Sequence, residues 1–142
     1  MVGRVYRVEK CLSYEPSLLS SYPVLEVTLY NLRMEKFDES LKIPIDTGFE
    51  GSLMLLSEDY EFFQIGELPR EAWRIYKTLV GPITMRVSRG FMEIDGRLVE
   101  VFIEAPLAGR GKRLIGRELI NKLVIVLDGP RSECCTSGKS PT

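Results

Sequence analysis

The stretch Ile43-Pro44-Ile45-Asp46-Thr47-Gly48 decides the fold expected of this chain. It places an ionisable carboxylate, that of Asp46, directly after an apolar segment and shortly before a second apolar run, Leu53–Leu56. A carboxylate can take a proton from water, and hydrolysis of an amide by this route needs a second carboxyl group that stays protonated beside the first. Asp-Thr-Gly occurs once in the 142 residues. A chain of this kind therefore either borrows the second carboxylate from another copy or does not use this chemistry.

Asp, Thr and Gly are also common turn residues, so a simple turn after a strand is an alternative interpretation of the tripeptide alone. A second segment, Arg113-Leu114-Ile115-Gly116-Arg117-Glu118-Leu119-Ile120, follows well downstream and places an apolar pair and a glycine before a short amphipathic stretch. Together the two segments resemble the retropepsin-like aspartic proteases, the single-lobed family that includes the retroviral proteases. Residues 43–53 are similar to the prokaryotic branch of that family, and the resemblance covers residues 23–130.

This resemblance implies an all-β domain, a closed barrel of short strands with one short helix near the C-terminus. It also implies a homodimer in which the Asp46 side chains of two copies meet on a two-fold axis, because such an axis presents the same surface from each subunit. Thr47 is expected to place its hydroxyl in a hydrogen-bonded lock beneath the two loops. Gly48 is expected to let the backbone approach the substrate closely.

The resemblance assigns roles to the residues that flank the two motifs. Phe49 stands where retroviral proteases have a small residue, and it is expected to narrow a substrate subsite. Glu50 is expected to contribute to the same region and to pair with Arg117, which follows Gly116. In a buried setting this pair would tie the active-site loop to the helix; the alternative is two solvated surface charges.

A β-hairpin over residues 74–87 is expected to cover the substrate as a flap. Its tip is assigned to Val80-Gly81-Pro82, where glycine suits a mobile turn. Pro82 makes this flap stiffer than a glycine-rich one.

Apolar alternation predicts the strands that such a fold needs. Apolar and polar residues alternate over 25–30 and again over 41–45, which leads directly to Asp46. Asp95-Gly96 lies between two further apolar segments and is a strong hairpin signal. Residues 117–122 are predicted to form one or two helical turns, and 123–127 a buried strand.

Composition narrows the classes of function. Hydrophobic residues make up 44% and charged residues 27%, as is typical of a soluble globular domain. The net charge of −1 gives no electrostatic basis for binding nucleic acid or an anionic membrane. Histidine is absent from the sequence, which removes Ser-His and Cys-His pairs and histidine metal sites, so neither a metal nor a cofactor is expected. With no signal-peptide pattern and no long apolar run, a cytoplasmic location is expected.

The cysteines and the C-terminal residues carry weaker signals. Cys11, Cys134 and Cys135 are odd in number and two are adjacent, which favours core or tail thiols over a disulfide framework or a zinc site. Residues 131–142 are predicted to be a disordered tail. Residues 1–130 then form one domain, of which 1–22 lie outside the resemblance.

The function expected from these features is that of a homodimeric aspartic endopeptidase. It would hydrolyse peptides or unfolded protein with water activated by two Asp46 carboxylates, one from each subunit. The alternative is a catalytically silent retropepsin-like module that serves in dimerisation or peptide binding.

Overall fold

A computed structural model describes residue 3 and residues 5–138, and most of its regular structure is β-strand. The strands are β1 (Lys10–Ser13), β2 (Val24–Tyr30), β3 (Lys36–Pro44), β4 (Leu53–Met54), β5 (Arg74–Thr78), β6 (Gly81–Ile94), β7 (Arg97–Pro106), β8 (Leu114–Ile115), β9 (Val124–Asp128) and β10 (Glu133–Ser137). The helices are α1 (Ser57–Tyr60) and α2 (Arg117–Ile120), with 3₁₀ turns at Glu61–Gly66 and Arg70–Ala72. None of the helices in the described part of the chain has the length and apolar character needed to cross a membrane.

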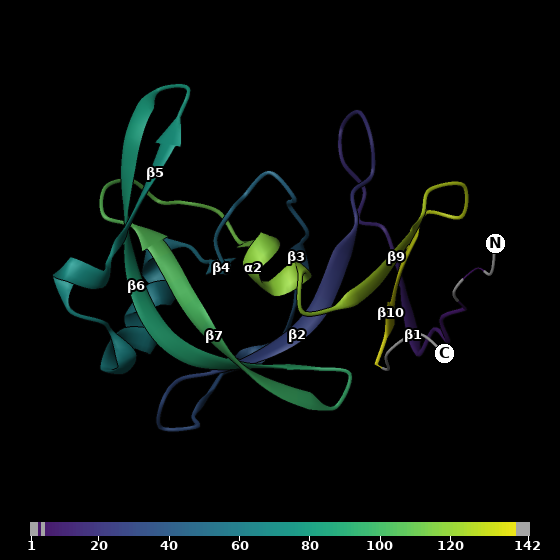
Figure 1. Ribbon diagram of the computed structural model, residues 1–142, viewed down its shortest axis with the longest axis horizontal. Helices are drawn as coiled ribbons and strands as arrows, with labels where there is room; N and C mark the ends of the chain where they lie inside the picture. Colours follow the sequence, from purple (N-terminus) through teal and green to yellow (C-terminus); the bar gives the residue numbers. More distant parts are fainter. Residues whose placement is uncertain (1–2, 4, 139–142) are drawn as a thin grey trace.

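The larger sheet contains β3 and β8, the strands that precede Asp46 and Gly116 in the two sequence motifs (Figure 1). Its order is β3-β2-β6-β7-β4-β8, and β5 pairs with β6 beside this path. The described strands thus form an open path, and we find no continuous closed barrel among them. An isolated bridge between Ile45 and Ile115 nevertheless joins the two ends of the path. This bridge brings the residue before Asp46 to the strand before Gly116.

The predicted alternation decides which side chains form the core. In β2, Leu25, Val27 and Leu29 alternate along the strand and are buried in the core, as expected for a strand with one face against a core. Opposite them pack Met92 and Ile94 of β6, Val101 and Ile103 of β7, and Tyr60 and Phe63 from the helical segment after β4. The hairpin predicted at Asp95-Gly96 is confirmed, since β6 and β7 pair through Ile94 and Arg97. The predicted short helix near the C-terminus is confirmed as α2.

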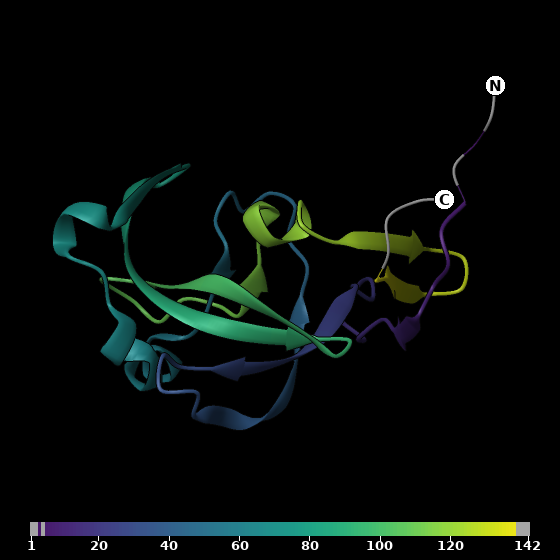
Figure 2. The ribbon, with the colours of Figure 1, turned by 60° about the horizontal axis from the view of Figure 1, so that its bottom comes forward.

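A second, three-stranded sheet lies beside the first and has the order β1-β10-β9 (Figure 2). Its central strand, β10, corrects the prediction of a disordered tail over 131–142, because Glu133–Ser137 pairs on both sides with β1 and β9. The remaining tail residues, 139–142, lie outside the described residues. The strand predicted at 123–127 is confirmed as β9.

A disulfide between Cys11 and Cys135 crosses this small sheet and corrects the prediction of ordinary thiols. The two residues are direct partners in the antiparallel pairing of β1 with β10, so their side chains leave the same face at neighbouring positions. Cys134, the residue before Cys135, points to the opposite face of the strand; it is a free thiol and is buried. Burial raises the pKa of the Cys134 thiol to about 11.

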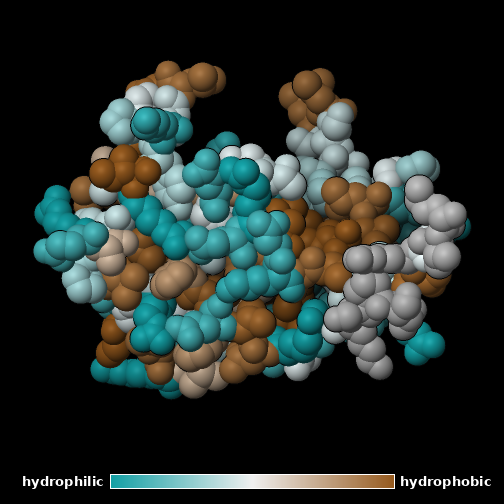
Figure 3. Space-filling model, in the orientation of Figure 1, coloured by the Kyte–Doolittle hydropathy of each residue, from teal (hydrophilic) through white to brown (hydrophobic). Residues whose placement is uncertain are grey.

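The hairpin formed by β5 and β6 projects from the body of the molecule (Figure 1). It confirms the predicted hairpin over 74–87. Leu79 and Val80 form its exposed tip, and Gly81 has a φ of 109°, a conformation that favours glycine. A second ordered turn, closed by backbone hydrogen bonds between Glu15 and Tyr22, also carries exposed leucines at its tip. Figure 3 shows these two apolar tips on the same side of the molecule.

Candidate active site

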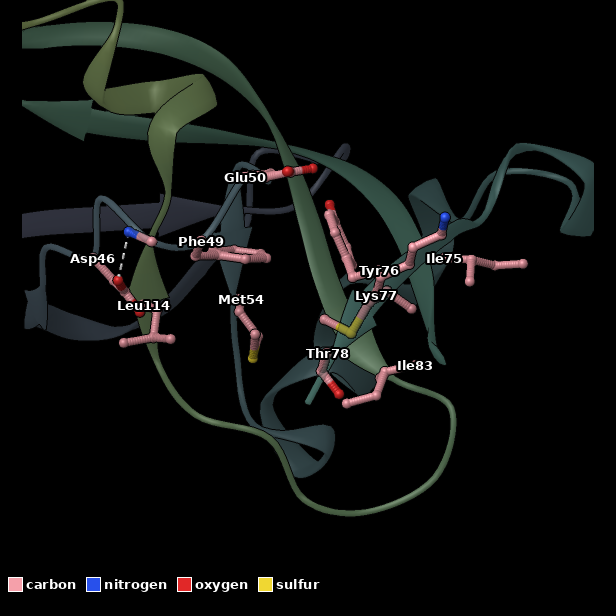
Figure 4. Close-up of a pocket in the computed structure, with 12 residues that line it drawn as sticks. Asp46, Phe49, Glu50, Met54, Ile75, Tyr76, Lys77, Thr78, Ile83 and Leu114 are labelled. Carbon is pink, nitrogen blue, oxygen red and sulfur yellow. Dashed lines mark hydrogen bonds between the residues drawn. The ribbon is translucent and has the colours of Figure 1, made fainter. Parts of the chain in front are cut away.

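Asp46 is held at the start of a tight loop by the backbone around it. Its own amide donates a hydrogen bond of 2.9 Å to the carbonyl of Ile115, and its carbonyl accepts one of 3.2 Å from Phe49. The Gly48 amide donates to Asp46 Oδ1 at 2.8 Å, which fixes the direction of the half-buried carboxylate (Figure 4). A Cβ at position 48 would lie 3.1 Å from the same oxygen, closer than most real Cβ contacts. Glycine at this position therefore allows the carboxylate to bond to the loop.

The second sequence motif, at Gly116, supports this loop through backbone hydrogen bonds. Gly116 donates to the carbonyl of Ser52 at 2.7 Å, Arg117 to that of Phe49 at 2.8 Å, and Glu118 to that of Gly51 at 3.0 Å. A Cβ on Gly116 would lie 2.6 Å from Phe49 Cδ2 and still closer to the carbonyl oxygen of Gly51. Only glycine leaves room for this approach. The structure thus brings the two sequence motifs into direct contact.

Glu50 and Arg117 form the expected ion pair, and of the two settings considered for it, buried or solvated, the structure shows the solvated one. Arg117 Nη2 lies 3.3 Å from Glu50 Oε1, while the two side chains are 47% and 71% exposed. The loop and α2 both direct these side chains outward in the single chain. A pair in solvent contributes about 0–1 kcal/mol, so in this chain alone it is not the main link between the motifs. The backbone hydrogen bonds described above make that link instead.

A pocket of about 480 Å³ lies between the Asp46 loop and the β5–β6 hairpin. Figure 4 shows Asp46 and Leu114 on one side of it, Phe49 and Met54 in the middle, and the hairpin residues opposite. Its lining residues are Asp46, Gly48, Phe49, Glu50, Met54, Ile75, Tyr76, Lys77, Thr78, Ile83, Met85 and Leu114. Most of these side chains are apolar. The pocket therefore combines one oriented carboxylate with a surface suited to apolar side chains.

The predicted site residues fall into two groups. Asp46, Gly48, Phe49 and Glu50 all line this pocket. Thr47 is exposed in the single chain and is not part of the pocket wall. The predicted hairpin tip, Val80-Gly81-Pro82, is shifted by one residue, because Leu79 and Val80 form the turn and Gly81 and Pro82 already pair in β6. These residues also lie away from the pocket of Asp46; Pro82 lines a neighbouring pocket of about 460 Å³ that reaches Leu107 and Gly111.

Glu104 is a buried acid beside this pocket that the sequence analysis did not identify. It lies on β7 and is fully buried. Its Oε2 accepts from the Ser52 amide at 2.8 Å and from Arg74 at 3.2 Å, and its Oε1 accepts from the Tyr76 hydroxyl at 2.6 Å. Burial raises the pKa of the Glu104 carboxyl group, although these donors oppose the shift. The sequence offered no signal, because a single acid at the end of an apolar strand does not reveal its cross-strand partners.

Comparison with known proteins yields a structural match and no sequence match. No protein-family model matches the chain, and no curated protein does. Among solved structures, the chain is similar to EIAV protease complexed with the inhibitor HBY-793, at a TM-score of 0.49 and 15% sequence identity. The match covers 76% of this chain and 93% of that one. No match bears on the narrower assignment to a prokaryotic branch.

Proposed function

We propose that this chain is one subunit of a homodimeric aspartic endopeptidase. The observation that carries the proposal is the position of Asp46, whose carboxylate is oriented by the Gly48 amide at the wall of an apolar pocket beneath a projecting hairpin. A protease of this type needs an accessible carboxylate, a surface for substrate side chains and a cover that limits water. The Asp46 carboxylate, the apolar pocket and the β5–β6 hairpin beside it support the proposal on these three counts.

The proposed chemistry uses two Asp46 side chains. One carboxylate takes a proton from water as the water attacks the peptide carbonyl, and the other, protonated, donates a hydrogen bond to that carbonyl oxygen. Two carboxyl groups this close do not both ionise, so they share one proton. The proton then passes to the leaving amine, and no covalent intermediate forms. Neither a metal nor a cofactor takes part in this proposal.

The second carboxylate has to come from another copy. Among the residues that line the pocket, Glu50 is the one acid besides Asp46, and it is paired with Arg117. A two-fold axis at the Asp46 loop would supply the missing carboxylate and would also cover the exposed Thr47.

The small sheet offers a surface for this dimer. Among the described strands, β9 pairs with β10 on one side and has no neighbour on the other. Val126 and Leu127 on this edge strand are substantially exposed. An exposed apolar edge strand readily pairs with another chain. Residues 5–8, near the other end of the described chain, are also exposed and are not part of a described strand, and we propose that they contribute to the same interface.

The proposed substrate is a peptide or an unfolded protein segment with an apolar side chain for the pocket. The test is cleavage of an unfolded polypeptide at acidic to neutral pH, together with inhibition by a statine-type transition-state mimic. Asp46→Asn keeps the shape of the side chain but cannot take the proton, so it should abolish turnover without altering the fold. Asp38→Asn is the matched control, because Asp38 is exposed on β3 and outside the pocket.

The alternative, a catalytically silent dimerisation or peptide-binding module, rests on the apolar lining of the pocket, which can hold a peptide side chain without turnover. It predicts that wild type and Asp46→Asn bind a peptide equally and that neither cleaves it. Undiminished cleavage by Asp46→Asn would reject the aspartic-protease proposal.

A further inference from the structure

Three segments that are distant in sequence meet at the Glu104 carboxylate. Ser52 belongs to the loop that begins at Asp46, Arg74 and Tyr76 belong to the outer strand of the hairpin, and Glu104 lies between them on β7. The contact is tight, because a Cβ on Gly51 would lie 2.5 Å from the Tyr76 hydroxyl. Arg74 also pairs with Glu118 of α2, at 2.9 Å. This cluster therefore joins the Asp46 loop, the hairpin and the Gly116 motif.

The hairpin depends on this cluster for its position. Strand β5 pairs with β6 on one side, and among its five residues Arg74 and Tyr76 are the two that are partly buried. Both of them bind Glu104. The ring of Tyr76 in addition packs edge-on against Phe49, with the centroids 5.5 Å apart, and both rings line the pocket. A change in the Tyr76–Glu104 contact would therefore shift one wall of the pocket relative to the other.

We propose that Glu104 is a positioning residue that holds the β5–β6 hairpin against the Asp46 loop and so sets the width of the pocket. Oε2 of the buried carboxylate accepts from the Ser52 amide of the loop and from Arg74 of the hairpin, and Oε1 accepts from the Tyr76 hydroxyl of the hairpin. The carboxylate thereby fixes the distance between the two segments. Its role in a reaction rests on the proposed function, but its role in placing the hairpin does not. Glu104 itself does not line the pocket and is not proposed to touch the substrate.

The variant that isolates this contact is Tyr76→Phe, which removes the hydroxyl and keeps the ring against Phe49. Amide hydrogen exchange over residues 74–87 reports local opening of the hairpin. In Tyr76→Phe we expect this exchange to become about tenfold faster or more, because the variant loses a hydrogen bond to a buried carboxylate. Glu104→Gln should also make this exchange faster, because the side-chain amide of Gln cannot accept hydrogen bonds from both Arg74 and Tyr76 as the carboxylate does.

A matched control exists in the same chain. The Tyr60 hydroxyl donates to Glu67 at 2.8 Å, and Arg86 pairs with Glu67. As at Glu104, a tyrosine hydroxyl and an arginine meet on one glutamate. Tyr60 and Glu67 do not line the pocket. Tyr60→Phe should leave exchange at residues 74–78 within twofold of wild type. Equal exchange at these residues in Tyr76→Phe and Tyr60→Phe would overturn the proposal.

Kinetics separate this proposal from the proposed function. If wild type cleaves peptides, Tyr76→Phe should raise KM several-fold while kcat falls less, because the pocket wall is displaced and Asp46 is untouched. A KM equal to that of wild type in an active enzyme would overturn the positioning role. If wild type cleaves nothing but the exchange difference is found, the protease proposal fails and the positioning of the hairpin by Glu104 stands.

Discussion

The backbone of Gly116 lies against that of Gly51 so closely that no side chain fits between them. Through this contact the segment before α2 supports the loop that carries Asp46, and three backbone hydrogen bonds from residues 116–118 reinforce it. The geometry of the candidate site therefore depends on two short segments more than sixty residues apart, and the connection between them is made by the backbone. Substitutions that alter the backbone contact should matter more than those that alter the charges nearby.

Gly116→Ala should destabilise the fold, because the added Cβ would overlap Phe49 and the Gly51 carbonyl. Overpacking of this kind costs about 1–3 kcal/mol. The measurement is the free energy of unfolding from urea denaturation. Gly129→Ala is the control, since a Cβ there meets no atom within 4 Å. Equal stability of the two variants would show that the close approach is not maintained in solution.

The Glu50–Arg117 pair should contribute little to the stability of the single chain. Both side chains are largely in solvent, so a double-mutant cycle between Glu50→Gln and Arg117→Met should give a coupling energy of about 0–1 kcal/mol. The measurement is urea denaturation at a protein concentration low enough to keep the chain monomeric. A coupling of about 3 kcal/mol or more would mean that the pair is buried after all.

The sequence motifs predicted this site in part because backbone contacts of this kind require glycine at set positions. Asp46, Gly48 and Gly116 were identified because the two segments that carry them resemble known motifs, and the hairpin over 74–87 was assigned from the same resemblance. Glu104 was missed because its partners, Ser52 and Tyr76, are reached only through strand register. The disulfide was missed because residues 11 and 135 are separated by 124 positions, and nothing in the sequence indicates that their strands are neighbours.

The pH dependence of stability should reveal the buried Glu104. Burial raises the pKa of this carboxyl group above its ordinary value of 4.5, so in the window just above 4.5 the folded state holds a proton that the unfolded state has lost. The contribution of Glu104 to stability is therefore fully present below pH 4.5 and decreases as the pH rises through the raised pKa. The free energy of unfolding of wild type minus that of Glu104→Gln should fall across this window. A difference that does not change with pH would mean that the pKa is not raised.

Reduction of the Cys11–Cys135 disulfide should destabilise the protein. The bond closes nearly the whole chain into a loop, and removal of such a bond costs about 2–5 kcal/mol. The measurement is urea denaturation with and without a thiol reductant, and the reductant should have no effect on Cys11→Ser. Such bonds are rare in the cytosol of mesophiles and common in oxidising compartments and in hyperthermophiles, so the redox state in the source cell also tests the expected cytoplasmic location.

The dimer should depend on the outer edge of β9. Leu127 is 52% exposed on this strand, so Leu127→Lys should leave the folded chain intact, whereas two lysines brought together across a two-fold axis would repel each other. Light scattering at micromolar concentration should report a dimer for wild type and a monomer for the variant, and peptide cleavage should be lost with the dimer because each chain then has one Asp46. Leu98→Lys is the control, since Leu98 is 49% exposed on β7, outside the small sheet, and its dimer and activity should match those of wild type. A Leu127→Lys protein that is monomeric and fully active would show that the second carboxylate does not come from a partner subunit.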